Sequence, residues 1–279
     1  MRERGRILWL TLAIVAGAGL GAGIVYFSRL GLPDSREALR QLEELDKNSL
    51  TALKESVGND HVPDNISGRI QDYTVRIGEA AAGLGVNERK PVLAAQRVFL
   101  PMVGLMADYE KAFKELDSAG GSSPATLVSQ EVIQERIVLA RRLLAANQAL
   151  LGFFRSVEAQ YRVELEKEAL PGEMKTQVMS GFRTGASIDL YLKIRESDDQ
   201  LTASVLKLLE LLSRSWGTWS VQPKGELAFE RKADLAEYQT LQSEMLAATE
   251  RQRSAQKELL QRAEQQQRWQ KQHAAKTGR

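Results

Sequence analysis

Apolar residues recur at alternating steps of three and four along most of the chain after residue 34. This spacing places them on one face of an α-helix. The longest uninterrupted pattern runs from residue 125 to about residue 169, and at about 1.5 Å per residue it would span about 65 Å. A helix of that length buries its apolar face only if other long helices lie beside it. The sequence therefore predicts an all-α fold, an elongated antiparallel helical bundle.

Segments rich in glycine, proline, asparagine and aspartate divide this pattern into separate helices. The predicted helical stretches cover residues 35–57, 65–82, 87–116, 125–169, 173–216 and 233 onward. Asn87 is in position to cap the third stretch. Pro101 lies inside that stretch and should kink it, because proline lacks a backbone donor and crowds the preceding turn. Gly181 and Gly185 mark a bend in the fifth stretch.

One segment departs from the helical pattern. Within residues 216–229, Trp219 and Val221 alternate with polar residues, which is the period of a β-strand. Pro223 and Gly225 stand at the second and fourth positions of a turn, where proline presets the backbone and glycine accepts a left-handed conformation. We predict a small β-hairpin that packs against the end of the bundle, because two strands alone are marginally stable in water.

The N-terminal residues 7–28 carry no side chain that is charged at neutral pH. As a helix this segment would reach about 33 Å, enough to cross the hydrocarbon core of a bilayer. A cleaved signal peptide is the alternative, because residues 7–15 are followed by a small-x-small pattern at residues 16–18. The apolar run continues past that point to Tyr26 and Phe27, which favours an uncleaved transmembrane helix, that is, a signal-anchor.

Four glycines in this segment are candidates for pairing two copies of the chain. Gly17 with Gly21, and Gly19 with Gly23, have the G-x-x-x-G spacing that lets membrane helices approach closely. The alternative is that small residues are simply frequent in membrane helices. A homodimer through this face is therefore one prediction of the sequence.

Arginines before the apolar segment predict its orientation. Arg2, Arg4 and Arg6 favour the cytoplasmic side, although Arg29 and Arg36 lie close to the other end. The bulk of the chain is then extracytoplasmic, and periplasmic in a bacterium. The predicted organisation is a cytoplasmic tail 1–6, a transmembrane anchor 7–28, a helical-bundle domain 29–249 that includes the hairpin at 216–229, and a polar basic C-terminal helix or tail 250–279.

Charge and cysteine content exclude several classes of function. The formal net charge of +2 points to no polyanionic partner, so no nucleic acid is expected, and without cysteine there are no disulfides or thiolate sites. Residues 250–279 hold eight basic and three acidic side chains, a net charge of +5. Because the apolar face fades after Thr249, this stretch is predicted to be solvated, with contact to anionic lipid headgroups as the alternative.

No arrangement of residues predicts catalysis, a metal or a cofactor. His61 lies between Asp60 and Asp64, but the other histidine, His273, falls in the predicted tail, so no ligand set converges. Phosphate-binding loops, nucleophile elbows, zinc-protease motifs and dinucleotide fingerprints are all missing. We therefore expect a protein that is not an enzyme and carries no cofactor.

A polar cluster interrupts the apolar stripe of the fifth stretch. Arg195, Asp198 and Asp199 could bind a small polar ligand inside the bundle. Two structural alternatives compete: a helix that restarts at the capping-box spacing of Ser197 and Gln200, or an ion pair within or between helices.

Two other pairs of residues stand out along the chain. Asn147 and Glu158 interrupt the stripe of the fourth stretch, either as polar register devices or where a partner helix ends. Trp216 and Trp219 are candidates for an aromatic docking surface, or for plugging the end of the bundle.

These features favour a membrane-anchored helical bundle that acts by protein–protein interaction, as a scaffold or assembly factor on the extracytoplasmic face. The expected partners are the bilayer, a second protein of unknown identity and a possible second copy of the chain. A ligand-sensing bundle that signals through dimerisation or a partner is the alternative, with the cluster at residues 195–199 as its site.

Overall fold

The computed structural model describes residues 65–223 and 225–276, together with six separate positions of an earlier helix. Those six positions are Gln41, Glu44, Asn48, Leu50, Thr51 and Lys54, and all are helical, as predicted for residues 35–57. The predicted membrane segment 7–28, with Gly17, Gly19, Gly21 and Gly23, lies outside the described residues, as does His61.

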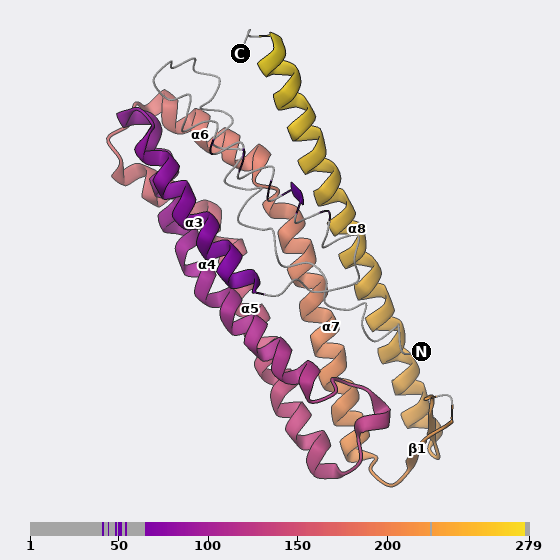
Figure 1. Cartoon of the computed structure of the whole chain (residues 1–279). Helices are drawn as coiled ribbons and strands as arrows, with labels where there is room; N and C mark the ends of the chain where they lie inside the picture. The colour runs from indigo at the N-terminus through magenta and orange to yellow at the C-terminus, as the bar shows by residue number, and fades with distance from the viewer. Residues whose placement is uncertain are drawn as a thin grey trace.

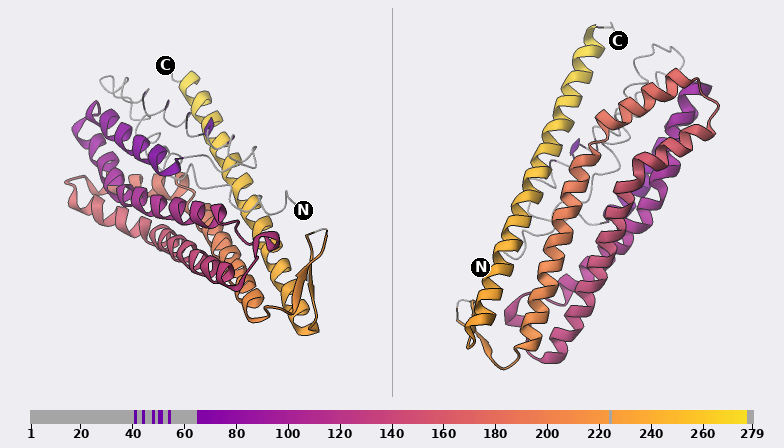
Figure 2. Two further views of the ribbon diagram at one scale, coloured as in Figure 1. Left: turned by 60° about the horizontal axis from the view of Figure 1, so that its bottom comes forward. Right: turned by 180° about the vertical axis from the view of Figure 1, so that it is seen from behind.

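Long helices dominate the described chain, which confirms the prediction of a helical bundle (Figure 1). They are α3 (Ile66–Ala82), α4 (Val86–Ser118), α5 (Gln130–Lys167), α6 (Gly172–Gly185), α7 (Ile188–Arg214) and α8 (Lys232–Lys276), with a short 3₁₀ turn at Pro124–Thr126. The principal contacts join α3 to α4, α4 to α5, α5 to α7 and α7 to α8. Figure 2 shows α6 near one end of the long helices and the hairpin at the other.

The helix starts follow local capping chemistry. Asn65 caps α3 by accepting a 3.2 Å hydrogen bond from the backbone N–H of Gly68. The prediction that Asn87 caps the next helix is wrong, because α4 begins at Val86 after Gly85 and already includes Asn87. Helix α5 begins at Gln130, five residues later than predicted, because its cap is Ser129 and the preceding residues form the 3₁₀ turn.

The bend predicted near Gly185 is a complete break between α6 and α7. Ser187 has a left-handed backbone with φ of 48°, which ends one helix and redirects the chain. Beyond it α7 is continuous from Ile188 to Arg214, so the alternative of a helix that restarts at Ser197 is wrong. The Ser197 hydroxyl instead donates to the carbonyl of Lys193 at 2.8 Å, within the same helix.

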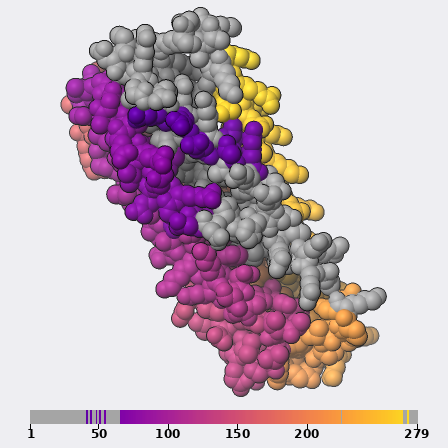
Figure 3. All heavy atoms as spheres, viewed as in Figure 1, coloured from indigo at the N-terminus to yellow at the C-terminus, as the bar shows by residue number. Residues whose placement is uncertain are grey.

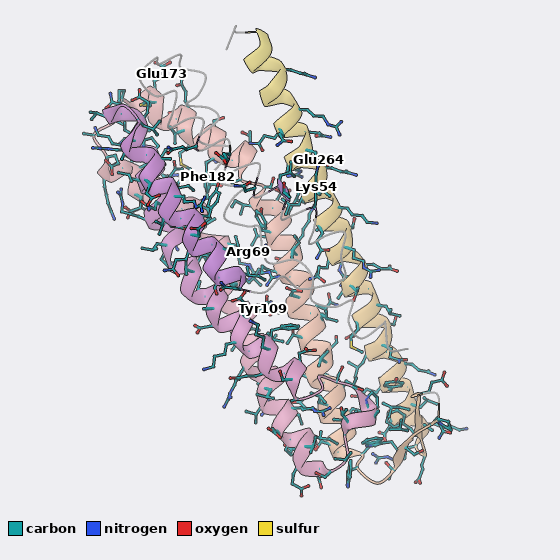
Figure 4. All side chains as sticks on the ribbon, viewed as in Figure 1. Lys54, Arg69, Tyr109, Glu173, Phe182 and Glu264 are labelled. Atoms are coloured by element: carbon teal, nitrogen blue, oxygen red, sulfur yellow. The ribbon has the colours of Figure 1, made fainter. Side chains whose placement is uncertain are left out.

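Aromatic rings fill the end of the bundle at which α6 lies. Phe182 of α6 packs 4.6 Å from the ring of Tyr161 on α5 and 6.4 Å from that of Phe99 on α4. Phe182 projects from α6 toward the long helices (Figure 4). The Tyr161 hydroxyl donates to the carbonyl of Pro91 at 3.1 Å, so this buried polar group is satisfied. Helix α6 thus closes one end of the core.

The opposite end carries the predicted hairpin. Strands β1 (Trp219–Val221) and β2 (Leu227–Phe229) pair antiparallel, and Gly225 has a φ of 77°, as its turn position requires. Leu227 is buried, and the ring of Phe229 lies 5.3 Å from that of Tyr238 on α8. The hairpin therefore packs on the first turns of α8, as the marginal stability of two strands demands.

Helix α8 stays docked on α7 beyond the point where its large apolar residues end. The expectation of a solvated stretch from residue 250 is wrong for its first half. The buried residues there are Gln252, Ala255, Gln256 and Leu259. Arg262 is ion-paired with Asp189 at 2.9 Å, at the start of α7. Small and carboxamide side chains continue the seam because they let two helices approach closely, and the Gln252 amide donates to Asp198 on α7.

The described positions of the first helix lie between α3 and α8. Leu50 belongs to the buried core, and Lys54 is ion-paired with Glu264 of α8 at 2.9 Å (Figure 4). Gln41, Glu44 and Asn48 line a cavity of about 230 Å³ with Arg76 and Glu79 of α3. In the space-filling view the described residues form an elongated molecule with α3 and α4 along one side and α8 along the other (Figure 3).

Candidate functional site

A layer of buried polar side chains crosses the middle of the bundle. It consists of Tyr109 from α4, Asn147 from α5, Arg195 and Asp198 from α7, and Gln252 from α8, and we call it the polar layer. No member exposes more than 4% of its surface. The four helices α4, α5, α7 and α8 therefore meet at this level through hydrogen-bonding groups rather than through apolar side chains.

Arg195 is the centre of the polar layer. It lies three residues before Asp198, so both side chains share one face of α7 and form an ion pair. Its Nη1 donates to Oδ1 of Asn147 at 3.1 Å, and Nδ2 of Asn147 donates to the backbone carbonyl of Arg195 at 3.0 Å. The guanidinium carbon lies 5.1 Å from the ring centre of Tyr109, a cation–π contact.

Asp198 connects the ion pair to the outer helices. Its Oδ1 accepts a hydrogen bond from Nε2 of Gln252, and its Oδ2 is 3.5 Å from the Tyr109 hydroxyl. Burial raises the pKa of Asp198 to about 6, and the charge of Arg195 opposes that rise. Burial also raises the pKa of Tyr109. At neutral pH the layer thus holds an ionised carboxylate beside a guanidinium and a neutral phenol.

The predicted ligand cluster is only partly assembled in this layer. The structure brings Arg195 and Asp198 together, as an ion pair within α7, which was one of the structural alternatives. Asp199 points to a different side of the helix and is half-buried. Because the polar atoms of the pair face partners from α4, α5 and α8, the fold itself occupies most of the groups that a ligand would use.

Two buried hydroxyls flank the polar layer on the same face of α7. Those of Tyr191 and Thr202 have no hydrogen-bond partner within the described part of the chain. Tyr191 stacks on Phe154 with ring centres 5.6 Å apart, so its ring is part of the apolar packing. The layer is therefore well satisfied at its centre and less so at its two edges.

Sequence reasoning found some members of the polar layer and missed others. Asn147 was predicted as a polar register device, and its buried position is consistent with that interpretation. Glu158 is not one, because it is half-exposed and pairs with Arg183 at 2.7 Å. Gln252 was assigned to a solvated stretch. The signal for its burial was a continued spacing of seven, since Met245, Gln252 and Leu259 fall on one stripe.

The two tryptophans occupy the hairpin end of the bundle. Their rings meet edge to face at 5.5 Å. The Trp219 indole N–H donates to the carbonyl of Leu212 at 2.9 Å, which satisfies an end carbonyl of α7 and fits the plug interpretation. Trp216 is 39% exposed, so it is the one of the two that presents aromatic surface to solvent.

A shallow groove of about 330 Å³ runs along the outside of α4 and α5. The residues lining it, which define the α4/α5 groove, are Arg97, Val98, Ser156, Ala159, Gln160, Val163 and Glu164. Val163 is 57% exposed, and so is Leu100, one helical turn after Arg97. Arg97 pairs with Glu164 at 2.8 Å and Glu168 at 2.6 Å, so one rim is charged and the floor is apolar. Sequence reasoning did not identify this face.

Within the described chain, α5 is the one helix long and apolar enough to cross a membrane, and half of its most apolar window is buried in the bundle. A core helix of a water-soluble domain passes the same test. Among residues 65–276 and the six earlier positions, no three His, Asp or Glu side chains converge to hold a metal ion.

No protein-family model matches the sequence, and no curated protein or solved structure is significantly similar to it. A function for this chain is therefore inferred from its own residues and geometry.

Proposed function

We propose that the chain is a single-pass membrane protein whose helical bundle acts by protein–protein interaction, as a scaffold or assembly factor on the extracytoplasmic face. The anchor is residues 7–28, oriented by the arginines before them. The observation that carries the proposal is the α4/α5 groove, with its exposed Val163. Apolar side chains in a concave, rimmed surface mark an interaction site more often than single exposed residues do.

The polar layer supports this proposal indirectly. A catalytic or ligand-binding layer needs groups directed at a vacant position. Here Arg195 and Asp198 are directed at Asn147, Tyr109 and Gln252 of the same chain. The polar layer therefore aligns the four helices, and the functional surface lies outside the core.

A photo-reactive amino acid placed in the groove tests the proposal. Val163, 57% exposed, is replaced in one variant, and Leu246 of α8, 60% exposed, is replaced in a matched control. Irradiation of intact membranes should join position 163 to a protein in a defined, stoichiometric product and leave position 246 unjoined. Equal labelling at both positions, or labelling at neither, would refute the assignment of this face.

Ligand sensing remains the second candidate, because the hydroxyls of Tyr191 and Thr202 are buried without partners in the described chain. A small polar molecule at the edge of the polar layer would satisfy them. Thermal unfolding of the full chain with pooled small metabolites separates the two functions. A ligand that stabilises the wild type and not a folded Thr202→Val variant supports sensing, whereas no stabilisation by any compound removes it.

A further inference from the structure

We propose that the C-terminal end of α8, residues 265–276, lies against the membrane that holds the anchor and contacts anionic phospholipid headgroups there. We call these residues the α8 extension. The inference rests on the proposed function and deepens it, because it names a surface that the anchored bundle binds. Three observations support it: where the first helix joins the bundle, how far α8 continues past its docked part, and the charge of that continuation.

The first helix joins the bundle at the end where α6 lies. Gln41 lines a cavity with Glu79, which belongs to the last turn of α3. Gln41 comes thirteen residues after Ser28, the last residue of the predicted anchor, and a chain of that length spans at most about 45 Å. The bundle is longer, because the 38 residues of α5 alone extend over about 57 Å. The anchor is therefore tethered nearest the α6 end, and the hairpin lies at the far end.

Helix α8 reaches the same end of the bundle and continues past the start of α7. Arg262 pairs with Asp189 in the first turn of α7 at 2.9 Å. Two residues later, Glu264 pairs at 2.9 Å with Lys54 of the first helix. The helix then runs on to Lys276, which adds about 21 Å after Arg262. Figure 2 shows this end of α8 beside the end where α6 lies, so the extension begins next to the tethered helix.

The α8 extension is not packed into the core. Leu259 is the last buried residue among the described side chains of α8, and Arg268 is 75% exposed. At 3.6 residues per turn, positions 268, 271 and 276 fall within about 140° of one another on the helix. They lie on the side opposite Gln252 and Leu259, which dock on α7. The basic positions of the extension therefore lie on the side of α8 that is turned away from α7.

Positive charge on the extension is not balanced by nearby acidic residues. After Glu264 the sequence contains four basic residues and no aspartate or glutamate, a net charge of +4 against +2 for the whole chain. The basic residues are Arg268, Lys271, Lys276 and Arg279. Glu264 lies 3.7 Å from Arg268 but also pairs with Lys54, so one carboxylate serves two cations. No acidic residue stands within four positions of Lys271 or Lys276, so their own helix offers them no ion pair.

The tether selects phospholipid as the partner of this charge. It holds the extension near a bilayer surface, where anionic headgroups attract each nearby lysine or arginine. Trp269 stands among the basic residues, and tryptophan is enriched at the membrane–water interface because its ring is apolar and its N–H is polar. A basic helix end with a tryptophan, tethered beside a bilayer, therefore fits an anionic lipid surface.

A fluorescent probe on the extension tests the contact. The chain contains no cysteine, so Gln272→Cys carries the only label. Gln239→Cys is the matched control, since both glutamines are exposed on α8 and lie about 50 Å apart along it. The full chain is placed in lipid discs of phosphatidylcholine, or of an equal mixture with phosphatidylglycerol, and each disc carries a headgroup-linked quencher. Quenching at position 272 should be strong in the mixture and weak in phosphatidylcholine, and position 239 should stay unquenched in both.

Removal of the charges gives a second readout in the same discs. Each basic residue near an anionic surface strengthens the contact about fivefold. Neutralising Arg268, Lys271 and Lys276 to glutamine should therefore weaken it about a hundredfold and abolish quenching at position 272. The matched control is Lys111→Gln, Lys114→Gln and Lys207→Gln, which removes three exposed lysines toward the hairpin end and should leave the quenching unchanged.

Four results would overturn the proposal: no quenching at position 272, equal quenching at positions 272 and 239, equal quenching in the two lipids, or quenching that survives neutralisation. The discs hold only this chain and lipid, so another protein cannot produce the signal. An alkaline carbonate wash of native membranes separates this inference from the proposed function. A chain that resists the wash but shows no quenching at position 272 overturns the lipid contact and leaves the anchored protein standing. A chain that the wash removes has no anchor, which overturns both.

Discussion

The polar layer predicts an asymmetry between removing one charge and removing both. Asp198→Leu leaves the guanidinium of Arg195 buried without its carboxylate, because Arg195 is 2% exposed. Loss of one partner of a buried ion pair costs about 3–5 kcal/mol. Arg195→Met leaves the carboxylate uncompensated in the same way and should cost a similar amount. If the two effects were independent, the double variant would lose about 6–10 kcal/mol.

The structure predicts a much smaller loss for the double variant. With both charges gone, the remaining penalties are those of the Gln252 amide and the Tyr109 hydroxyl, which lose their acceptor on Asp198, and of Asn147 Oδ1, which loses its donor on Arg195. An unsatisfied buried donor costs about 1–3 kcal/mol. The double variant should therefore be more stable than additive losses predict, and adding Gln252→Leu should recover part of the remaining loss.

Urea unfolding of the full chain in a mild non-ionic detergent, followed by far-ultraviolet circular dichroism, measures these free energies. The slope of the unfolding free energy against urea concentration should stay constant across the series, so that the midpoints of unfolding can be compared. Arg155→Met is a matched control, since that arginine is 60% exposed and pairs with Glu196 at the surface; it should cost less than about 1 kcal/mol. Losses that add up in the double variant would refute the closed polar layer.

Three further predictions follow from the described contacts. The pKa of Asp198 is raised from 3.8 to about 6. Its contribution to the free energy of unfolding is therefore complete below pH 3.8 and is lost as the pH rises through 6. The wild type should lose up to about 3 kcal/mol over this range, and urea unfolding measured at several pH values should show a smaller change with pH for Asp198→Asn. Phe182→Ala should cost about 3–5 kcal/mol in the same assay, because it opens the aromatic end of the core. Val163→Glu in the α4/α5 groove should reduce capture of the partner protein with little loss of stability, and Leu246→Glu should leave both unchanged, as measured by pull-down from solubilised membranes and by urea unfolding.

The periodicity of the sequence was enough to predict the architecture. Steps of three and four identified every long helix, because the buried face of a helix must be apolar. The hairpin was predicted from Pro223 and Gly225, whose backbone preferences leave few alternatives in a turn. These signals depend on residues that are close in sequence, so they can be recognised without knowing which helices become neighbours.

The errors arose where tertiary contacts override local signals. Ser197 has the spacing of a cap, but its helix continues because α7 is packed against α5 and α8 along its length. Residues after Thr249 look solvated by composition, yet Gln252 and Gln256 are buried because α7 supplies a surface for them. The α4/α5 groove could not be predicted, because its walls come from two helices and depend on how these pack against each other.

The order of the helices also shapes how the chain reaches this fold. Principal contacts join helices that are adjacent in sequence or separated by the short α6, so most of the core can assemble from successive helical hairpins. Domains rich in such local contacts have low contact order and fold rapidly. The ion pair between Lys54 and Glu264 is different, because it joins segments separated by most of the chain. The contact between these two segments should therefore form late in folding. Hydrogen exchange should show that it is the first part of the bundle to open.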